Sequence, residues 1–397
     1  MKAGWERTTL GAAFTTATGT TPPKSNADYY GQYMPLVKPP ELCDAPLDSA
    51  EDGLTEAGAA VARTLPPNSI LVSCIGNLGK VGLNTVPVAF NQQINAILPN
   101  ESKATPEFLF YQVLSCTFKE QLEAMASGTT VSIVNKSKFN SIEIVLPPLP
   151  EQQRIVGILD EAFEGIATAT ANAEKNLHNA RALFESHLQS VFSQRGEGWV
   201  EKQLEEIVDG NCTLSYGIVQ PGNDYTNGLP VVRPTDLTSK LITPEGLKLI
   251  DPKLAEGYRR TTLRGGELLL CVRGSTGVIS VAAPELVGAN VTRGIVPIMF
   301  NPDLLRQDFG YFLMTSEPIQ NQIREKTYGA ALMQINIGDL RKIVVSYPNL
   351  SVQAELSERL QDISTETHHL KSIYQQKLSA LDALKKSLLD QAFRGEL

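Results

Sequence analysis

A proline-free stretch from Glu151 to Gln194 most constrains how this chain can fold. Its apolar residues recur at steps of three, four and seven, which places them on one face of a helix. Prolines precede the stretch within 147–150, where a missing N–H costs least, and Gly196 and Gly198 follow it. At 1.5 Å per residue this helix is about 65 Å long, much longer than the helices of ordinary domains.

A helix of this length needs a partner along its apolar face, because intrinsic propensity alone does not stabilise it. The stretch from Val352 to Phe393 carries a second apolar face of the same kind, so we expect the two helices to pair. Two core helices of an ordinary domain are the alternative. The residues expected to pack between the helices are Ile155, Leu159, Phe163, Ile166, Leu177 and Phe184 in the first, and Leu360, Ile363, Leu370, Leu381 and Leu388 in the second.

The chain is also an internal repeat with a period near 200 residues. Landmarks recur in the same order at a nearly constant offset, which chance does not readily produce. The matched landmarks are Gly4-Trp5 and Gly198-Trp199, Val37-Lys38-Pro39 and Val232-Arg233-Pro234, Leu65–Gly79 and Leu263–Gly277, Asn91 and Asn290, Ile142–Leu149 and Lys342–Leu350, Gln153 and Gln353, and Leu188–Phe192 and Leu389–Phe393.

Each half therefore reads as a mixed domain of about 150 residues followed by a long helix. Short apolar runs rich in branched residues predict strands at 70–76, 142–149, 267–274 and 342–348. Residues 105–127 predict a helix with Thr105 as N-cap and Pro106 at the first position. Its counterpart in the second half has Asp303 in its first turn. The expected class is α+β, with domains at 1–150 and 197–350 and helical segments at 151–196 and 351–397.

The composition of the chain describes a soluble globular protein. Of its 397 residues 42% are hydrophobic and 20% are charged, and the net charge is −8, with no basic segment. This acidity argues mildly against a free-standing nucleic-acid binder. The five cysteines are scattered without C-x-x-C spacing, so neither a disulfide framework nor a zinc site is expected. The chain has no signal-peptide pattern and no membrane-length apolar run, so we expect a cytoplasmic location without membrane contact.

The sequence offers no catalytic constellation. All four histidines fall on the two long helices, and none forms an H-E-x-x-H pair, so no metal site is expected. The chain also has no G-x-S-x-G nucleophile turn and no G-x-G-x-x-G phosphate turn. A loop near Gly76 fails as a phosphate loop because Val81 stands where a Ser or Thr would reach magnesium. A binding and assembly protein without its own cofactor is therefore favoured over an enzyme.

Two glycine-containing loops, around Gly76 and Gly274, follow equivalent strands and are the informative polar segments. Glycine turns allow backbone N–H groups to approach an anion, and Lys or hydroxyl groups suit phosphate. Arg suits guanine, whereas Asn and Gln suit adenine. Gln93 and Asn95 are further polar side chains after the next strand. Exposed loop residues without a partner are the alternative. The candidate DNA-binding residues are Lys38, Asn77, Lys80 and Gln92 in the first half, and Arg233, Arg273, Ser275, Thr276 and Arg293 in the second.

Several motifs resemble one known family. The segment PLPEQQRIV from Pro148 leads into the long helix, and W-x4-L opens the second domain at Trp199. The closing LKKSLLDQAFRGEL from Leu384, together with SYGIVQPG, VVRPTDL, GTTPP and MPLVKPPEL in the domains, completes the pattern. The whole chain is similar to the specificity subunit of type I restriction-modification systems.

This resemblance implies two target-recognition domains in a pseudo-twofold repeat, each reading one half of a split double-stranded DNA sequence. Two long antiparallel coiled-coil helices would hold them apart and set the spacer. Two methyltransferase subunits would dock, bring S-adenosylmethionine and methylate adenine N6, and two restriction subunits that use ATP and magnesium could join. The chain itself would perform no chemistry. A coiled-coil protein-interaction adaptor without DNA reading, and an enzyme with an unrecognised site, are the alternatives.

Overall fold

The structure is a computed structural model that describes residues 4–128, 130–194, 196–329 and 332–397. The chain divides into two compact units. Unit 1 comprises Met1–Lys175 and Gln375–Leu397, and unit 2 comprises Asn176–Tyr374. Each unit thus contains one globular domain together with parts of both long helices. Within the described ranges, no helix has an apolar stretch long enough to cross a membrane.

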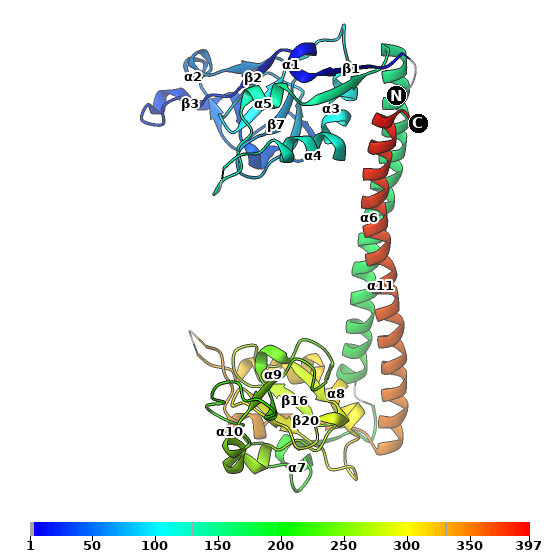
Figure 1. Cartoon of the computed structure of the whole chain (residues 1–397). Helices are drawn as coiled ribbons and strands as arrows, with labels where there is room; N and C mark the ends of the chain where they lie inside the picture. The colour runs from blue at the N-terminus through cyan, green and yellow to red at the C-terminus, as the bar shows by residue number, and fades with distance from the viewer. Residues whose placement is uncertain (1–3, 129, 195, 330–331) are drawn as a thin grey trace. The chain divides into compact units, whose positions relative to one another are not determined.

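The two long helices are confirmed as α6 (Leu149–Ser193) and α11 (Leu350–Arg394), each of 45 residues. In unit 1 the start of α6 lies beside the end of α11 (Figure 1). The Arg154 guanidinium donates a hydrogen bond of 2.7 Å to the backbone oxygen of Leu397. Further along, the Lys385 ammonium lies 5.2 Å from the centre of the Phe163 ring. Because α6 residue numbers rise as α11 numbers fall, the helices are antiparallel within unit 1.

The apolar residues of the helices are buried to different degrees along their length. Ile155, Leu159 and Leu360 are at most 1% exposed, and they lie where a helix also packs against a domain. The remaining eight residues expected at the helix pair are half-buried. In a pair of only two helices, the partner helix covers one side of each of these side chains and the other side stays open to solvent, which accounts for their partial burial. Leu384, part of the same sequence pattern, is 47% exposed.

Unit 1 contains mixed sheets and short helices. Its helices are α1 (Leu10–Ala13), η1 (Ala27–Tyr29), η2 (Pro39–Glu41), α2 (Glu56–Val61), α3 (Pro106–Leu114), α4 (Cys116–Ala124) and α5 (Lys136–Asn140). Its strands are β1 (Glu6–Thr9), β2 (Thr16–Thr18), β3 (Tyr30–Val37), β4 (Ala45–Leu47), β5 (Gly53–Leu54), β6 (Thr64–Leu65), β7 (Ile70–Ser73), β8 (Val81–Asn84), β9 (Val88–Phe90), β10 (Ile94–Ile97) and β11 (Glu143–Leu146).

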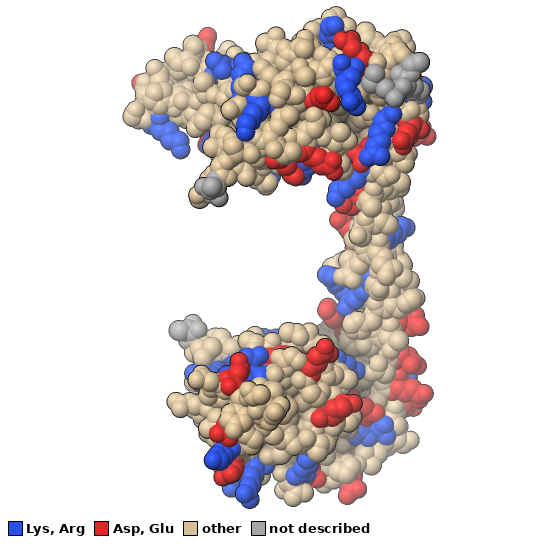
Figure 2. All heavy atoms as spheres, viewed as in Figure 1, with Lys and Arg blue, Asp and Glu red and all other residues tan. Residues whose placement is uncertain are grey.

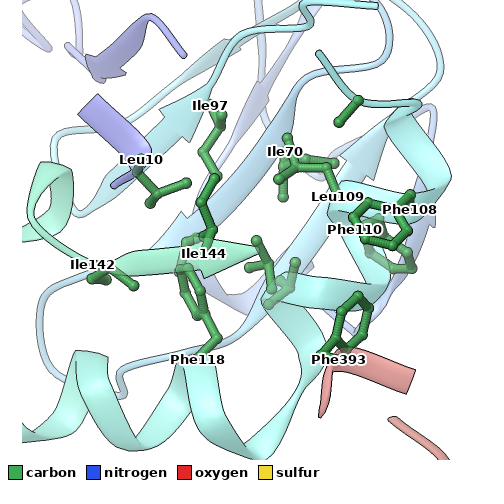
Figure 3. Packing of buried hydrophobic residues seen from close by; sticks show 14 of the residues in the cluster. Leu10, Ile70, Ile97, Phe108, Leu109, Phe110, Phe118, Ile142, Ile144 and Phe393 are labelled. Atoms are coloured by element: carbon green, nitrogen blue, oxygen red, sulfur yellow. The ribbon is translucent and has the colours of Figure 1, made fainter. Parts of the chain in front are cut away.

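The strands of unit 1 pair in the orders β2-β10-β7-β8-β4, β5-β3-β9-β6 and β1-β11. The pairs β4–β8 and β3–β9 are parallel, whereas the other pairs are antiparallel. The largest core cluster of unit 1 joins this domain to both long helices. Phe393 of α11 packs edge-on against Phe108 of α3, with ring centres 5.3 Å apart (Figure 3). The end of α11 therefore completes the core of the first domain.

Unit 2 has a similar order of elements, with fewer strands. Its helices are α7 (Leu204–Ile207), η3 (Pro234–Asp236), η4 (Pro252–Thr261), η5 (Pro284–Leu286), α8 (Gln307–Thr315), α9 (Glu317–Glu325) and α10 (Ile337–Arg341). Its strands are β12 (Val200–Gln203), β13 (Leu229–Val232), β14 (Leu241–Ile242), β15 (Lys248–Ile250), β16 (Leu268–Cys271), β17 (Ile279–Ala282), β18 (Asn290–Val291), β19 (Ile295–Ile298) and β20 (Val344–Tyr347). They pair in the orders β14-β17-β16-β19, β15-β13-β18 and β12-β20.

The expected α+β class and the four expected strands are confirmed, as β7, β11, β16 and β20. Thr105 is the N-cap of α3, and its side chain accepts a hydrogen bond from the backbone N–H of Phe108. The expectation of one helix over 105–127 is wrong. Ser115 has extended backbone angles, and its hydroxyl caps α4 as a separate helix. The placement of Asp303 in a first helical turn is also wrong, because α8 begins at Gln307.

Candidate nucleic-acid interface

The two glycine-containing loops form the same tight turn in both units. In unit 1 the turn follows β7, and the backbone N–H of Gly79 donates to the oxygen of Ser73 at 3.0 Å. In unit 2 it follows β16, and the N–H of Gly277 donates to the oxygen of Cys271 at 2.9 Å. Gly76, Gly79, Gly274 and Gly277 all have positive φ angles between 77° and 95°. A side chain at these positions would strain the backbone, so the glycines permit the turn.

Each turn forms backbone hydrogen bonds with a second segment, which the sequence pattern did not predict. In unit 1 the N–H of Gly76 donates to the oxygen of Ser132 at 2.9 Å, and Ile75 forms an isolated β-bridge with Ile133. In unit 2 the N–H of Gly274 donates to the oxygen of Met333 at 2.8 Å, and Arg273 bridges Gln334. The signal that could have revealed these segments is the recurrence of Gly128 as Gly329, both with positive φ.

The β-bridges identify which residues of the two turns are equivalent. Arg273 corresponds to Ile75, because each forms the bridge to the second segment. Lys80 corresponds to Val278, because each accepts the backbone hydrogen bond from the last strand residue before the turn. Lys80 and Arg273 therefore carry charge at different positions of the turn. The two units present different side chains on one backbone scaffold.

In unit 2 the structure brings three of the candidate residues together. Arg233, Arg273 and Arg293 line one surface hollow of about 560 Å³. They come from three separate places in the domain: the end of β13, the turn after β16 and the loop after β18. Arg293 is exposed, and its guanidinium carbon lies 6.0 Å from the centre of the Tyr216 ring. The apolar part of the lining comprises Ile218, Val219, Pro221, Pro234 and Leu332.

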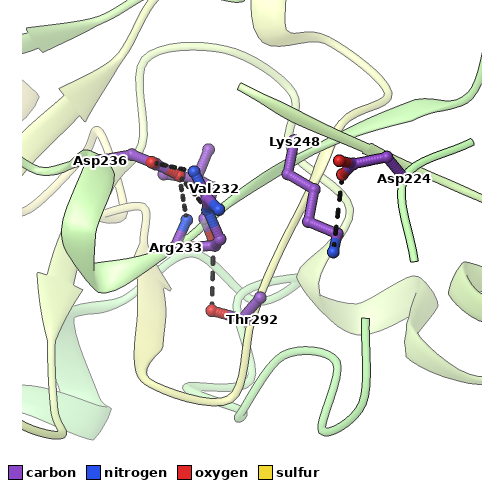
Figure 4. Close-up of polar contacts among 6 residues, drawn as sticks. All are labelled: Asp224, Val232, Arg233, Asp236, Lys248 and Thr292. Atoms are coloured by element: carbon purple, nitrogen blue, oxygen red, sulfur yellow. Dashed lines mark hydrogen bonds and ion pairs between the residues drawn. The ribbon is translucent and has the colours of Figure 1, made fainter. Parts of the chain in front are cut away.

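Arg233 is engaged by a carboxylate within its own turn (Figure 4). Its Nε and Nη2 atoms donate to the two oxygens of Asp236 at 3.1 and 2.8 Å, and its backbone N–H donates to the same carboxylate. The hydrogen bond to Asp236 raises the pKa of the Arg233 guanidinium. Nearby, the ammonium of Lys248, the first residue of β15, lies 3.6 Å from the Asp224 carboxylate. Arg233 is thereby fixed in orientation at the edge of the hollow.

Ser275 and Thr276 lie at the tip of the unit 2 turn. Ser275 is exposed, and the Thr276 hydroxyl donates to the backbone oxygen of Met333 at 3.4 Å. Neither residue is among the described residues that line the hollow. On the same turn as Arg273, they present one hydroxyl without a hydrogen bond to a described residue and one weakly bonded hydroxyl, which suits contact with a phosphate.

The candidates of unit 1 are more dispersed. Lys38 is ion-paired with Asp52, and Gln92 accepts a hydrogen bond of 2.9 Å from the Thr21 hydroxyl. Asn77 is exposed at the turn, and Lys80 is half-buried beside it. Asn95 is different, since it is 2% exposed and bonds Thr18 and Val134. Gln93 bonds the side chain of Asn91. The amide of Asn95 thus supports the fold, and the suggestion that it faces a ligand is wrong.

The described residues contain no group of three or more His, Cys, Asp or Glu side chains placed to hold a metal ion. His178, His368 and His369 are exposed on the long helices, whereas His187 is half-buried. In the view of Figure 2, basic and acidic side chains are interspersed over both units. Positive charge is therefore local, and the arginine hollow of unit 2 is the clearest local concentration in a candidate site.

Comparison with known proteins gives concordant results. Residues 2–177 match the model of the type I restriction modification DNA specificity domain. The type I restriction enzyme EcoBI specificity subunit of Escherichia coli is 23% identical over 353 residues, which cover 83% of this chain and 74% of that protein. The HindI specificity subunit of Haemophilus influenzae is 34% identical over 168 residues, which cover 40% of this chain and 36% of that protein.

Solved structures also match the chain over its whole length, and one of them has a TM-score of 0.82. It comes from a study of complex assembly and conformational transition of the type I R-M system. The alignment covers 100% of this chain and 99% of that chain, at 21% sequence identity. At this level of identity the structural likeness establishes the fold.

Proposed function

We propose that this chain is a specificity subunit of a type I restriction-modification system, because residues 2–177 match the DNA specificity domain and a specificity subunit aligns with most of the chain, and that its two domains each read one half of a split DNA sequence. The observation that carries this proposal is that one backbone turn is built twice. Both units place a glycine turn after equivalent strands, and both hold it with an equivalent second segment. Equivalent scaffolds with different side chains suit two half-sites of different sequence.

The long helices suit a role in setting the spacing between the two DNA half-sites. Each is a continuous helix of 45 residues with parts in both units, so the number of its helical turns is fixed by the sequence. We propose that this length determines the spacer between the two DNA half-sites. The chain would then act as a non-catalytic ruler, with recognition in its domains and spacing in its helices.

Partner subunits would supply the chemistry. Two methyltransferase subunits would dock on this chain, bind S-adenosylmethionine and transfer a methyl group to adenine N6, and restriction subunits that use ATP and magnesium could join them. The acidic net charge of −8 is compatible with DNA reading in such a complex, because phosphate contacts can come from the partners.

The test is to co-express the chain with a partner methyltransferase and to map methylated adenines across a genome. A split motif with a fixed spacer is expected. Arg273→Ala is expected to relax one half-site, and Lys80→Ala is expected to affect the other, with the spacer unchanged in both. An assembled complex that yields no motif would refute the proposed function, and two variants that retain the full motif and affinity would refute the loop assignment.

Two further measurements separate the alternatives. Retention of the assembled complex on duplex DNA should fall steeply with salt, because neutralised phosphates release counterions. If retention of the complex on duplex DNA does not change with salt concentration, a protein-interaction adaptor is favoured. Binding of S-adenosylmethionine by the isolated chain would favour an enzyme with an unrecognised site.

A further inference from the structure

The three arginines of the unit 2 hollow differ in how many of their donors are free. Arg233 already forms a forked pair with Asp236 through Nε and Nη2, which occupies two of its five N–H donors and fixes its orientation. Arg273 and Arg293 make no side-chain hydrogen bond to any described residue of the protein, and the buried Nε of Arg273 lacks a partner. Arg273 and Arg293 are therefore the two arginines at this hollow whose guanidinium groups have no hydrogen-bond partner among the described residues.

The backbone holds these two arginines close together. The N–H of Arg293 donates to the oxygen of Ile218 at 2.8 Å, and the N–H of Val272 donates to the oxygen of Gly294 at 2.8 Å. A Cβ atom at Gly294 would lie 2.5 Å from the ring of Pro234 and 3.8 Å from the Cβ of Arg273. Glycine at 294 thus lets the loop after β18 approach the turn after β16, so that both arginines reach one hollow.

The chemistry of the hollow selects among the four bases. Guanine presents two acceptors, O6 and N7, on its major-groove edge, and Arg matches both with its forked donors. Adenine presents a donor at N6, which opposes a guanidinium, cytosine presents a donor at N4, and thymine presents a single acceptor, O4, so that none of the three matches both donors of an arginine fork. The described lining of the hollow includes no carboxylate that could accept from either amine. Two free guanidinium groups over a largely apolar floor therefore favour guanine.

The equivalent positions of unit 1 carry different chemistry. Ile75 stands where unit 2 has Arg273, because both residues form the bridge to the second segment. Gln92 stands where unit 2 has Arg293. Gln93 follows Gln92 and Gly294 follows Arg293, and each of these two following residues accepts a backbone hydrogen bond from the same position of its turn. The two free arginine forks of unit 2 are thus absent from these positions of unit 1.

We propose that unit 2 reads guanine in its half-site, through the guanidinium groups of Arg273 and Arg293 on the major-groove edge, and that unit 1 does not use these positions to read guanine. The inference rests on the proposed function, and it assigns a base and two specificity-determining residues to it. Asp236 holds the guanidinium of Arg233 at the edge of the hollow, and Arg233 is not assigned to base reading.

The experiment uses the assembled methyltransferase complex after its methylation motif has been mapped. Guanines of the motif are replaced one at a time by 7-deazaguanine, which lacks the N7 acceptor, or by inosine, which keeps N7 and O6 but lacks the minor-groove amine. Duplex affinity is then measured for the wild-type complex and for Arg273→Ile and Arg293→Gln, which install the residues of unit 1. We expect 7-deazaguanine in one half-site to weaken wild-type binding about tenfold to a hundredfold, and inosine to have little effect.

In the variant that lacks the arginine bonded to N7, the same 7-deazaguanine should cause almost no further loss, because the donor that used N7 is gone, whereas the other variant should remain sensitive. Gln92→Ala is the matched control, and it should alter the other half-site while full sensitivity to 7-deazaguanine is retained. Retention of the unit 1 half-site in the methylation motif shows that the Arg273→Ile and Arg293→Gln chains are folded.

Three outcomes would overturn the guanine assignment: a split motif without a G·C pair in the half-site that these variants relax, wild-type binding that is insensitive to 7-deazaguanine there, or sensitivity to inosine alone. Absence of any split motif would instead refute the proposed function, so the two failures are distinguishable.

Discussion

Two buried thiols lie at the base of the recognition turns. Cys74 follows β7 and is 2% exposed, and Cys271 ends β16 and is fully buried. Burial raises the pKa of Cys74 to about 12 and also raises the pKa of Cys271. Because the thiolate is the reactive form, a raised pKa lowers its reactivity at neutral and mildly basic pH. Both thiols therefore behave as small apolar residues that support the turns.

We predict that one thiol of the native chain reacts quickly with Ellman's reagent at mildly basic pH, and that it is Cys43, the exposed cysteine. Cys43→Ser should remove the fast phase. Cys74 and Cys271 are buried with raised pKa values and should react only after unfolding, whereas the half-buried Cys116 and Cys212, whose pKa values are also raised by burial, should react more slowly than Cys43. A fast phase that survives in Cys43→Ser would contradict the assigned burial.

Residue chemistry near the turns could be predicted only in part. The pattern T-P-E predicts the cap at Thr105 because the cap and its target are three residues apart. The hollow of unit 2 could not be predicted, because Arg233, Arg273 and Arg293 meet through three separate chain segments. The burial of Asn95 also depends on contacts with distant residues, Thr18 and Val134, which a local pattern does not encode.

At the scale of elements, a buried glutamine attaches each long helix to its domain. Gln152 is fully buried at the start of α6, where its amide donates to the oxygens of Lys103 and Pro147 and its carbonyl accepts from the N–H of Thr105. Gln353 makes the same three contacts at the start of α11, with Leu304, Pro348 and Arg306. The structural counterpart of Gln353 is therefore Gln152 and not Gln153. The sequence match differs by one residue because Gln153, which is exposed, is also a glutamine and lies next to Gln152.

We predict that Gln152→Ala destabilises unit 1 by about 2–4 kcal/mol, because it leaves buried backbone groups without partners. Gln153→Ala is the matched control and should change stability by less than about 0.5 kcal/mol. Urea unfolding followed by fluorescence reports on unit 1 in a Trp199→Phe background, because Trp5 then remains as the single tryptophan and lies in the core of unit 1. Equal effects of the two substitutions would contradict the attachment role of Gln152.

At the scale of the whole molecule, the length of the helix pair is the quantity that the proposed function uses. We predict that four residues inserted in α6 near Ala169, with four matched residues in α11 near Ala380, lengthen the DNA spacer. The added rise is about 6 Å, roughly two base pairs, and four residues are close to one turn, so the apolar faces stay nearly in register. The methylation motif measures the result. An unchanged spacer in an active complex would refute the ruler.

The sequence predicted this organisation well, for identifiable reasons. The repeat and the two long apolar faces extend over many residues, so neither depends on the exact alignment of any one of them. The break at Ser115 within the predicted helix was missed, because a single serine with extended backbone angles carries little signal in an otherwise helical pattern. The second segment that holds each turn was missed because it lacks a strong pattern of its own.

The closure of unit 1 by the end of α11 has a consequence for biosynthesis. Phe393 packs on Phe108, and Arg154 bonds Leu397 across 243 residues of chain. Unit 2 is complete once Tyr374 has been made, whereas unit 1 still lacks its last 23 residues, Gln375–Leu397. The domain that leaves the ribosome first is therefore finished last, with an apolar surface uncovered while the rest of the chain is translated. Nascent unit 1 is the part of this protein on which a chaperone would act.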